Sequence, residues 1–148
     1  MEFQKKVVVL LLQKLTNQNH DYMNEIDEKF LLQCKKNFMD NIRPSNKDSL
    51  NKIGYQTLIE IAKKYFEKGE IEKFSSFFQE FQYNVNLWVA HLILEYGQPN
   101  ELIKFEAIEI IHRYSSSPFD LTLAFEEKQW LIKNKIYSPD GSDMSSER

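Results

Sequence analysis

The stretch NVNLWVAHLILEYG, residues 84–97, is apolar on nearly every side. A helix that is hydrophobic all round is buried, so we expect this one at the centre of the core. Trp88, His91 and Glu95 nevertheless share one stripe of it, because residues three and four apart on a helix point the same way. The fold therefore depends on this helix, and its polar stripe is the first candidate for a site.

The rest of the chain is also predicted to be helical. Only four glycines and four prolines interrupt the sequence, and apolar residues recur between them at intervals of three and four, which indicates an all-α protein. About seven helices are expected: residues 2–16, residues 21–41, a helix that ends at Gly69, residues 71–81, the stretch above, residues 101–114, and a last helix that begins in SSSPFD, residues 115–120.

Two helix starts and several inward side chains follow from these patterns. Ser45, with Asp48 three residues later, predicts a capping box before the third helix. Ser117 is the expected cap of the last helix, with Pro118 in the first turn and Asp120 favoured there by the helix dipole. The side chains expected to point inward include Phe38, Leu50, Ile53 and Phe81.

The length of 148 residues suits a single domain, which at this size buries roughly 70% of the surface of its unfolded chain. We expect one helical domain over residues 1–137, with N-terminal helices in 1–69 and a distinct C-terminal part in 70–137. Residues 138–148 contain one large apolar side chain and are expected to be disordered.

Composition excludes several classes of function. The net charge of -3 gives no general basic field, and the lysine pairs have the spacing of solvated helix faces, so direct nucleic-acid binding is not expected. The lone Cys34 cannot form an internal disulfide and is expected to be a buried structural residue in a reducing cytoplasm. The apolar run at residues 7–12 is too short for a membrane span and lacks a cleavage site, so we expect neither export nor a membrane.

His91 and Glu95 are the most suggestive chemical pair in the sequence. They could be a base with its orienting acid or half of a metal site, and His112 could approach His91 if the two helices pack together. A zinc site needs three or four ligands, and the HExxH pattern is absent. Gly-rich phosphate loops, GxSxG and CxxC are absent as well. We therefore expect no enzyme, no metal and no cofactor. The alternative role for His91 and Glu95 is that of a hydrogen-bonded structural pair at the edge of the core.

The charge distribution is most one-sided between residues 95 and 127. This stretch has only Lys104 and Arg113 as cations, against the acids Glu95, Glu101, Glu106, Glu109, Asp120, Glu126 and Glu127. Acidic surfaces steer basic partners toward a binding site. The alternative is that these acids form the solvated faces of two helices.

The second half of the chain carries a family resemblance. The segments VNLWVAHLILEYG, EAIEIIHRYS and FDLTLAFEEKQWLIKNK, within residues 85–137, resemble small bacterial HEAT-like helical-repeat proteins of the toxin-immunity kind. The matching features are Trp88, Gly97 and Gln129-Trp130-Leu131. Where the family commonly has a glycine-bearing turn, this chain has Lys133-Asn134-Lys135. The resemblance implies helices paired into a short stack and a role in neutralising a toxin.

The sequence thus predicts a cytoplasmic immunity protein that covers the active cleft of a cognate toxin. The acids suit a nuclease with a basic surface, delivered by contact-dependent inhibition or another secretion system. The expected contacts are the seven acids above and Trp88, with Trp130 a second possible anchor, although both tryptophans lie among aliphatic residues. The alternatives are a helical-repeat adaptor for a peptide or cellular protein, an enzyme built on His91 and His112, and a DNA-binding antitoxin.

Overall fold

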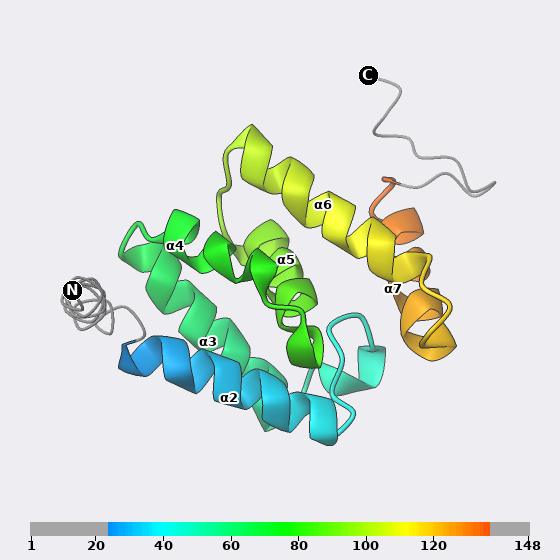
Figure 1. Cartoon of the computed structure of the whole chain (residues 1–148), viewed down its shortest axis with the longest axis horizontal. Helices are drawn as coiled ribbons and strands as arrows, with labels where there is room; N and C mark the ends of the chain where they lie inside the picture. The colour runs from blue at the N-terminus through cyan, green and yellow to red at the C-terminus, as the bar shows by residue number, and fades with distance from the viewer. Residues whose placement is uncertain (1–23, 137–148) are drawn as a thin grey trace, which may run out of the picture. The chain divides into compact units, whose positions relative to one another are not determined.

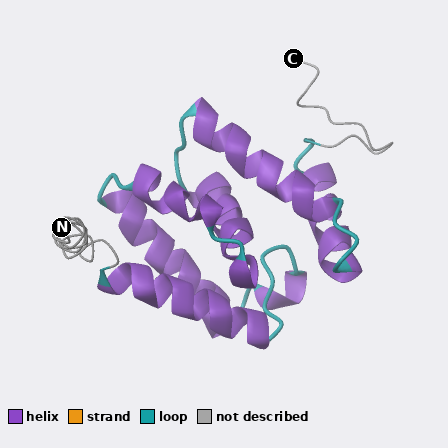
Figure 2. Ribbon diagram, viewed as in Figure 1, coloured by secondary structure: helices purple, strands orange, loops and turns teal. Residues whose placement is uncertain are grey.

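The computed structural model describes residues 24–136, which form α-helices and short 3-10 helices without a strand (Figure 2). The α-helices are α2 (Glu25–Met39), α3 (Ile53–Glu67), α4 (Ile71–Ser75), α5 (Val85–Tyr96), α6 (Glu101–Ser115) and α7 (Leu121–Lys133), and the 3-10 helices are η2 (Lys47–Ser49), η3 (Ser76–Gln79) and η4 (Gln82–Asn84). The predicted all-α class is confirmed for this part of the chain. The expected first helix, residues 2–16, and the tail at 138–148 lie outside the described residues.

Contacts divide the chain into two units, Met1–Gln33 and Cys34–Arg148, and the boundary falls within α2. The described part of the first unit is the start of α2, which begins with a reciprocal cap. The side-chain oxygen of Asn24 accepts hydrogen bonds from the backbone N–H groups of Ile26 and Asp27, and the Asp27 carboxylate accepts one from the Asn24 N–H. This exchange satisfies backbone donors that the first helical turn leaves free.

Within the second unit α5 occupies the centre, as its sequence predicts. Nine consecutive residues, Val85 to Ile93, are buried. The helix contacts α3, α4 and η3, and it also packs on α6, which in turn contacts α7 (Figure 1). Trp88 meets the ring of Tyr55 edge-on at a centroid distance of 4.8 Å. Truncating a buried tryptophan of this kind costs about 3–5 kcal/mol, so α5 anchors the core.

Two helices end in the same backbone motif with different residues. Gly69 ends α3 with φ of 71°, and the Glu70 N–H donates to the Tyr65 carbonyl at 2.9 Å, which confirms the predicted glycine stop. At the end of α7, Lys135 has φ of 58° and the Ile136 N–H donates to the Leu131 carbonyl at 2.9 Å. A side chain in this left-handed conformation costs about 1 kcal/mol relative to glycine, so the lysine makes the second turn more strained.

Both predicted serine caps are wrong. Asn46 caps η2 by accepting from the Asp48 N–H at 3.0 Å, while Ser45 bonds elsewhere. Asp120 caps α7 by accepting from the Leu123 N–H at 3.1 Å, so α7 starts after this residue rather than after Ser117. Aspartate and asparagine are at least as good as serine at this position, and here they stand closer to the true first turns.

Four side chains predicted to point inward are exposed instead: Phe38, Leu50, Ile53 and Phe81. Leu50 lies before α3 and Ile53 is its first residue, so the apolar helical face predicted to include them begins only after them. The segment 71–81 breaks into α4 and η3, which turns Phe81 away from the core. The buried position predicted for Cys34 is confirmed. None of the helices in residues 24–136 is long and apolar enough to cross a membrane.

Candidate functional site

His91 pairs with a carboxylate, but the partner is Glu127 rather than the predicted Glu95. Its Nε2 lies 2.6 Å from Oε1 of Glu127, and the two side chains are only 3% and 0% exposed. Glu95 lies on the exposed last turn of α5, where it accepts a hydrogen bond from Nε1 of Trp130 at 3.1 Å. The polar stripe on α5 therefore splits into a buried hydrogen bond with α7 and a separate contact at the surface.

Glu127 could have been located from its helical spacing. It follows Leu123 and Ala124 and precedes Leu131 at intervals of three and four, and all four side chains are buried on one face of α7. A carboxylate with no exposed area needs a partner, because an unpaired buried charge is very costly. The assignment of Glu127 to an acidic surface is thus wrong, and its role is inside the fold.

Ser45 completes a chain of three polar side chains. Its Oγ lies 3.2 Å from the same Nε2 of His91 that contacts Glu127. In a Ser–His–acid triad the acid binds the other ring nitrogen, whereas Nδ1 of His91 has no hydrogen-bond partner here. The trio therefore lacks triad geometry. Since Nε2 and Glu127 share one hydrogen between them, the hydroxyl hydrogen of Ser45 remains available as a donor.

Glu126, the neighbour of Glu127, also has internal partners. It accepts two hydrogen bonds of 2.8 Å from Arg43 and one of 2.7 Å from Asn46. Burial tends to raise the pKa of Glu126, but the hydrogen bonds from Arg43 and Asn46 outweigh it, and the pKa lies below its usual value. These bonds hold the segment before α3 against α7.

The remaining residues that were predicted at the interface differ in their exposure and in their contacts. Trp88 is buried in the core and cannot be an exposed anchor, so that prediction is wrong. Trp130 is half-buried, with its ring edge-on to His91. Asp120 is exposed but caps α7. Glu101 and Glu106 are exposed and Glu109 is half-buried, and these three acids all belong to α6.

One face of α6 combines acids with exposed apolar side chains. We call it the α6 surface and define it by Leu102, Phe105, Glu106, Glu109 and Arg113, whose spacing of three and four places them on one side of the helix. Leu102 and Phe105 are 64% and 60% exposed. Of the predicted acidic surface, only the part on α6 therefore remains as a candidate, and it contains exposed apolar side chains between its acids.

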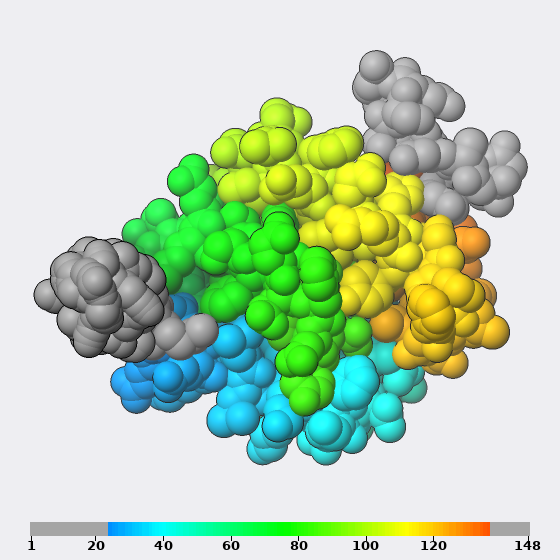
Figure 3. Space-filling model, in the orientation of Figure 1, coloured from blue at the N-terminus to red at the C-terminus, as the bar shows by residue number. Residues whose placement is uncertain are grey.

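A shallow groove borders the α6 surface. It has a volume of about 430 Å³, and Phe78 and Phe81 line its other side. Figure 3 shows the green segment that contains these residues directly beside the yellow α6. Phe81 and Phe105 thus lie at the same groove, and this clustering links two segments that the sequence does not connect.

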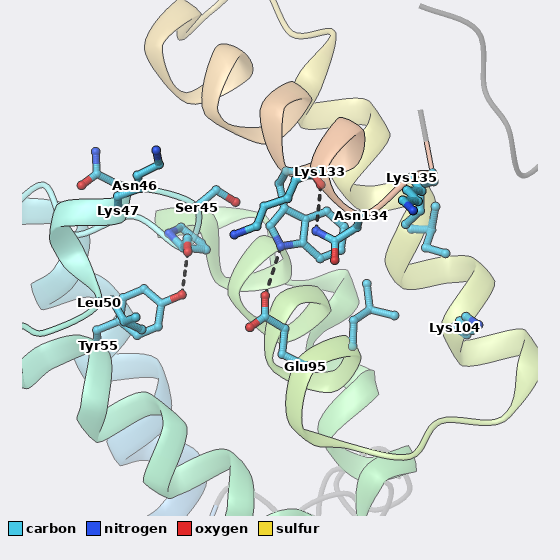
Figure 4. A pocket seen from close by; sticks show the side chains of 15 residues that line it. Ser45, Asn46, Lys47, Leu50, Tyr55, Glu95, Lys104, Lys133, Asn134 and Lys135 are labelled. Carbon is cyan, nitrogen blue, oxygen red and sulfur yellow. Dashed lines mark hydrogen bonds between the residues drawn. The ribbon is translucent and has the colours of Figure 1, made fainter. Parts of the chain in front are cut away.

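A second pocket lies elsewhere, between the segment 44–50 and the ends of α5 and α7 (Figure 4). Its volume is about 820 Å³. The charged side chains that line it are Lys47, Lys104, Lys133, Lys135 and Glu95. Ser45 also reaches this pocket, so the buried chain from Glu127 through His91 ends at its wall. The pocket is basic although the chain as a whole is acidic.

This pocket is hard to predict from the sequence for a topological reason. Its four lysines come from three separate segments, and none of these segments is basic enough to stand out alone. The one local signal is Lys133-Asn134-Lys135, which by itself indicates only a departure from a glycine-bearing turn. The net charge and the lysine pairs therefore give no sign of this local group of cations.

Among residues 24–136, no group of three or more His, Cys, Asp or Glu side chains is placed to hold a metal ion. Comparisons with protein-family models, curated protein sequences and solved structures find no match to this chain.

Proposed function

We propose that this chain is a binding protein rather than an enzyme, and that it neutralises a protein toxin through the α6 surface. The observation that carries the proposal is the cluster of exposed Leu102, Phe105 and Phe81 beside the acids of α6. Exposed apolar patches rimmed by polar residues mark protein-binding sites. Aromatic residues at the centre of such a patch commonly supply most of the binding energy.

The charges around this patch favour a basic partner. Glu101, Glu106 and Glu109 lie on α6 near Phe105, and Lys104 and Arg113 are the cations on the same helix that balance part of their charge. Opposite potentials across an interface speed association and exclude wrong partners. A nuclease cleft is built to attract phosphate, so acids of this kind suit a surface that covers one.

The helical arrangement supports the same proposal. The packing of α5 on α6 and of α6 on α7 fits a helical stack of the HEAT-like kind that the segments in 85–137 resemble. Proteins of that kind look like immunity partners of delivered toxins. We accordingly propose that the protein acts in the cytoplasm of a bacterium against a nuclease toxin encoded beside it.

The test is co-expression with the toxin encoded by the adjacent gene, combined with a binding measurement on the purified pair. We expect growth to be rescued and a complex to form. Phe105→Ser should weaken the complex by about thirtyfold, the loss of about 2 kcal/mol that is typical of a central aromatic contact. Phe119→Ser is the matched control, because Phe119 is 93% exposed and lies outside the α6 surface.

A second pair of variants tests the charges. Glu106→Lys combined with Glu109→Lys should slow association about tenfold and reduce its salt dependence. Glu60→Lys combined with Glu67→Lys changes the net charge equally on exposed positions of α3 and should have a much smaller effect. Equal effects of the two pairs would refute the α6 surface, and failure of both rescue and binding would refute immunity toward that toxin.

A further inference from the structure

The positive charge of the basic pocket exceeds the negative charge that lines it. None of its four lysines forms an ion pair with another residue of 24–136. Among the residues that line the pocket the acid is Glu95, and the C-terminal ends of α5 and α7 each carry roughly half a negative charge. Together these offset about two of the four positive charges. An excess of about two matches a phosphate monoester, which carries about -1.5 to -2 at neutral pH.

The pocket also offers polar groups in fixed positions. The Ser45 oxygen lies 3.2 Å from Nε2 of His91, which itself contacts the buried Glu127, so the core fixes the position of the hydroxyl at the pocket wall. In the view of Figure 4, Lys133 extends its ammonium toward Ser45, and Lys47 lies on the same side of the pocket. Lysine binds phosphate as a point charge, and a neighbouring hydroxyl adds a directed hydrogen bond.

Lys135 lines the pocket in a left-handed backbone conformation. This residue occupies the position that glycine takes at the end of α3, with φ of 58° against 71° for Gly69. Glycine there would be less strained, yet the chain places a cation at the pocket. Strained residues of this kind cluster at binding sites, where the gain in function offsets their cost.

Apolar side chains complete the walls and set the size of the ligand. Leu50, Ile108 and Ile136 line the pocket together with Trp130. The exposed Leu50, which lies outside the core, thus has a place in this wall. The volume of about 820 Å³ lies within the roughly 300–1,000 Å³ that is usual for small-molecule sites.

We propose that this pocket binds a small phosphate monoester with a planar apolar group, of the size of a mononucleotide. Lys47, Lys133 and the Ser45 hydroxyl bind the phosphate, Lys104 and Lys135 contribute to the field, and the apolar wall contacts the ring. This site is separate from the α6 surface and does not depend on the toxin-binding proposal.

The two tryptophans of the chain give a direct readout. Trp130 lines the pocket and Trp88 is buried in the core, so their indole N–H signals in an NMR spectrum report on the site and on the fold separately. AMP, adenosine and inorganic phosphate are titrated to about 10 mM, ten times a weak Kd of about 1 mM. We expect AMP to move the Trp130 signal to saturation, phosphate to move it less, and adenosine to leave it nearly unchanged, with Trp88 constant throughout.

Lysine variants separate phosphate recognition from unspecific attraction. Lys47→Gln combined with Lys133→Gln should weaken AMP binding about tenfold, since screened lysine contacts contribute modestly one by one. Lys64→Gln, at an exposed position of α3 outside the pocket, should leave it unchanged. Lys135→Gly should have opposite effects on two measurements: the Tm rises by about 3 °C because strain is removed, while AMP binds more weakly.

Several outcomes would overturn the proposal. One is that no ligand moves the Trp130 signal, and another is that adenosine moves it as strongly as AMP. A third is that the pocket variants bind AMP as the unmodified chain and Lys64→Gln do. A Lys135→Gly variant that is more stable and binds AMP with unchanged affinity would remove that lysine from the site.

Discussion

The buried pair of His91 and Glu127 allows a sharp prediction about stability. Removing one member of a buried, hydrogen-bonded pair that includes a carboxylate leaves the other member without a partner and costs about 3–5 kcal/mol, whereas replacing both groups by apolar ones is often nearly neutral. Glu127→Leu leaves His91 with Ser45 at 3.2 Å, so we expect a loss of about 3 kcal/mol. His91→Leu leaves a carboxylate that is 0% exposed without any partner, so about 4–5 kcal/mol is expected.

The double variant distinguishes this account from simple loss of packing. With both residues changed to leucine, no polar group of the pair remains buried, and we expect the free energy of unfolding to return to within about 1 kcal/mol of the original value. Glu127→Gln keeps the volume and one hydrogen bond to His91, so its loss should be only about 1 kcal/mol. This variant keeps the comparison measurable if a leucine variant does not fold.

Urea unfolding at neutral pH, followed by far-UV circular dichroism, gives the free energy of unfolding for each variant. The expected order of loss is His91→Leu, then Glu127→Leu, then the double variant and Glu127→Gln. The reasoning would be refuted if each single leucine variant lost less than about 1 kcal/mol, or if the two losses simply added in the double variant.

Three further predictions concern other parts of the fold. Gly97→Ala should cost about 2 kcal/mol, because its Cβ would lie 3.0 Å from the Ile93 carbonyl, while Gly69→Ala meets no atom within 4 Å and should cost only its backbone strain of about 1 kcal/mol; equal urea midpoints would contradict this. Because the pKa of Glu126 is lowered, the Arg43 contact stabilises the fold above pH 4.5, and this contribution is lost as the pH falls further. Arg43→Gln should therefore lower the free energy of unfolding by about 1 kcal/mol at neutral pH and make it depend less on pH in the acid range. An unchanged dependence of the free energy of unfolding on acid pH would count against this. Burial raises the pKa of the Cys34 thiol, so a thiol reagent should label it only as fast as the chain unfolds, and rapid labelling of the native protein would show that the thiol is accessible.

Periodicity was sufficient for the helices whose burial is simple. Helix α5 is apolar on nearly every side, so only a position at the centre of the core buries it. Gly69 ends α3 because few other residues adopt a positive φ at low cost. Helix starts were harder, because Ser45, Asn46 and Ser117 are all plausible caps on local grounds. Tertiary contact decides between them: Ser45 is drawn to His91, which leaves Asn46 as the cap.

The charged residues show why a site is harder to predict than a fold. A run of acids in the sequence looked like one surface, yet Glu126 and Glu127 point to Arg43 and His91, which lie far away in the chain. The lysine pocket shows the opposite case, because its lysines are far apart in the sequence and come together only in the folded unit. Local charge counts cannot register pairing of either kind.

The central position of α5 has a consequence for synthesis of the chain. Part of its covering comes from α3 and α4, which precede it, and part from α6, which is translated after it. A nascent chain released up to residue 96 therefore carries a nearly continuous apolar helix with one side uncovered. Such surface attracts chaperones and promotes aggregation until the remaining helices emerge from the ribosome. Translational pausing just after α5 should accordingly lower the yield of folded protein more than pausing after α7.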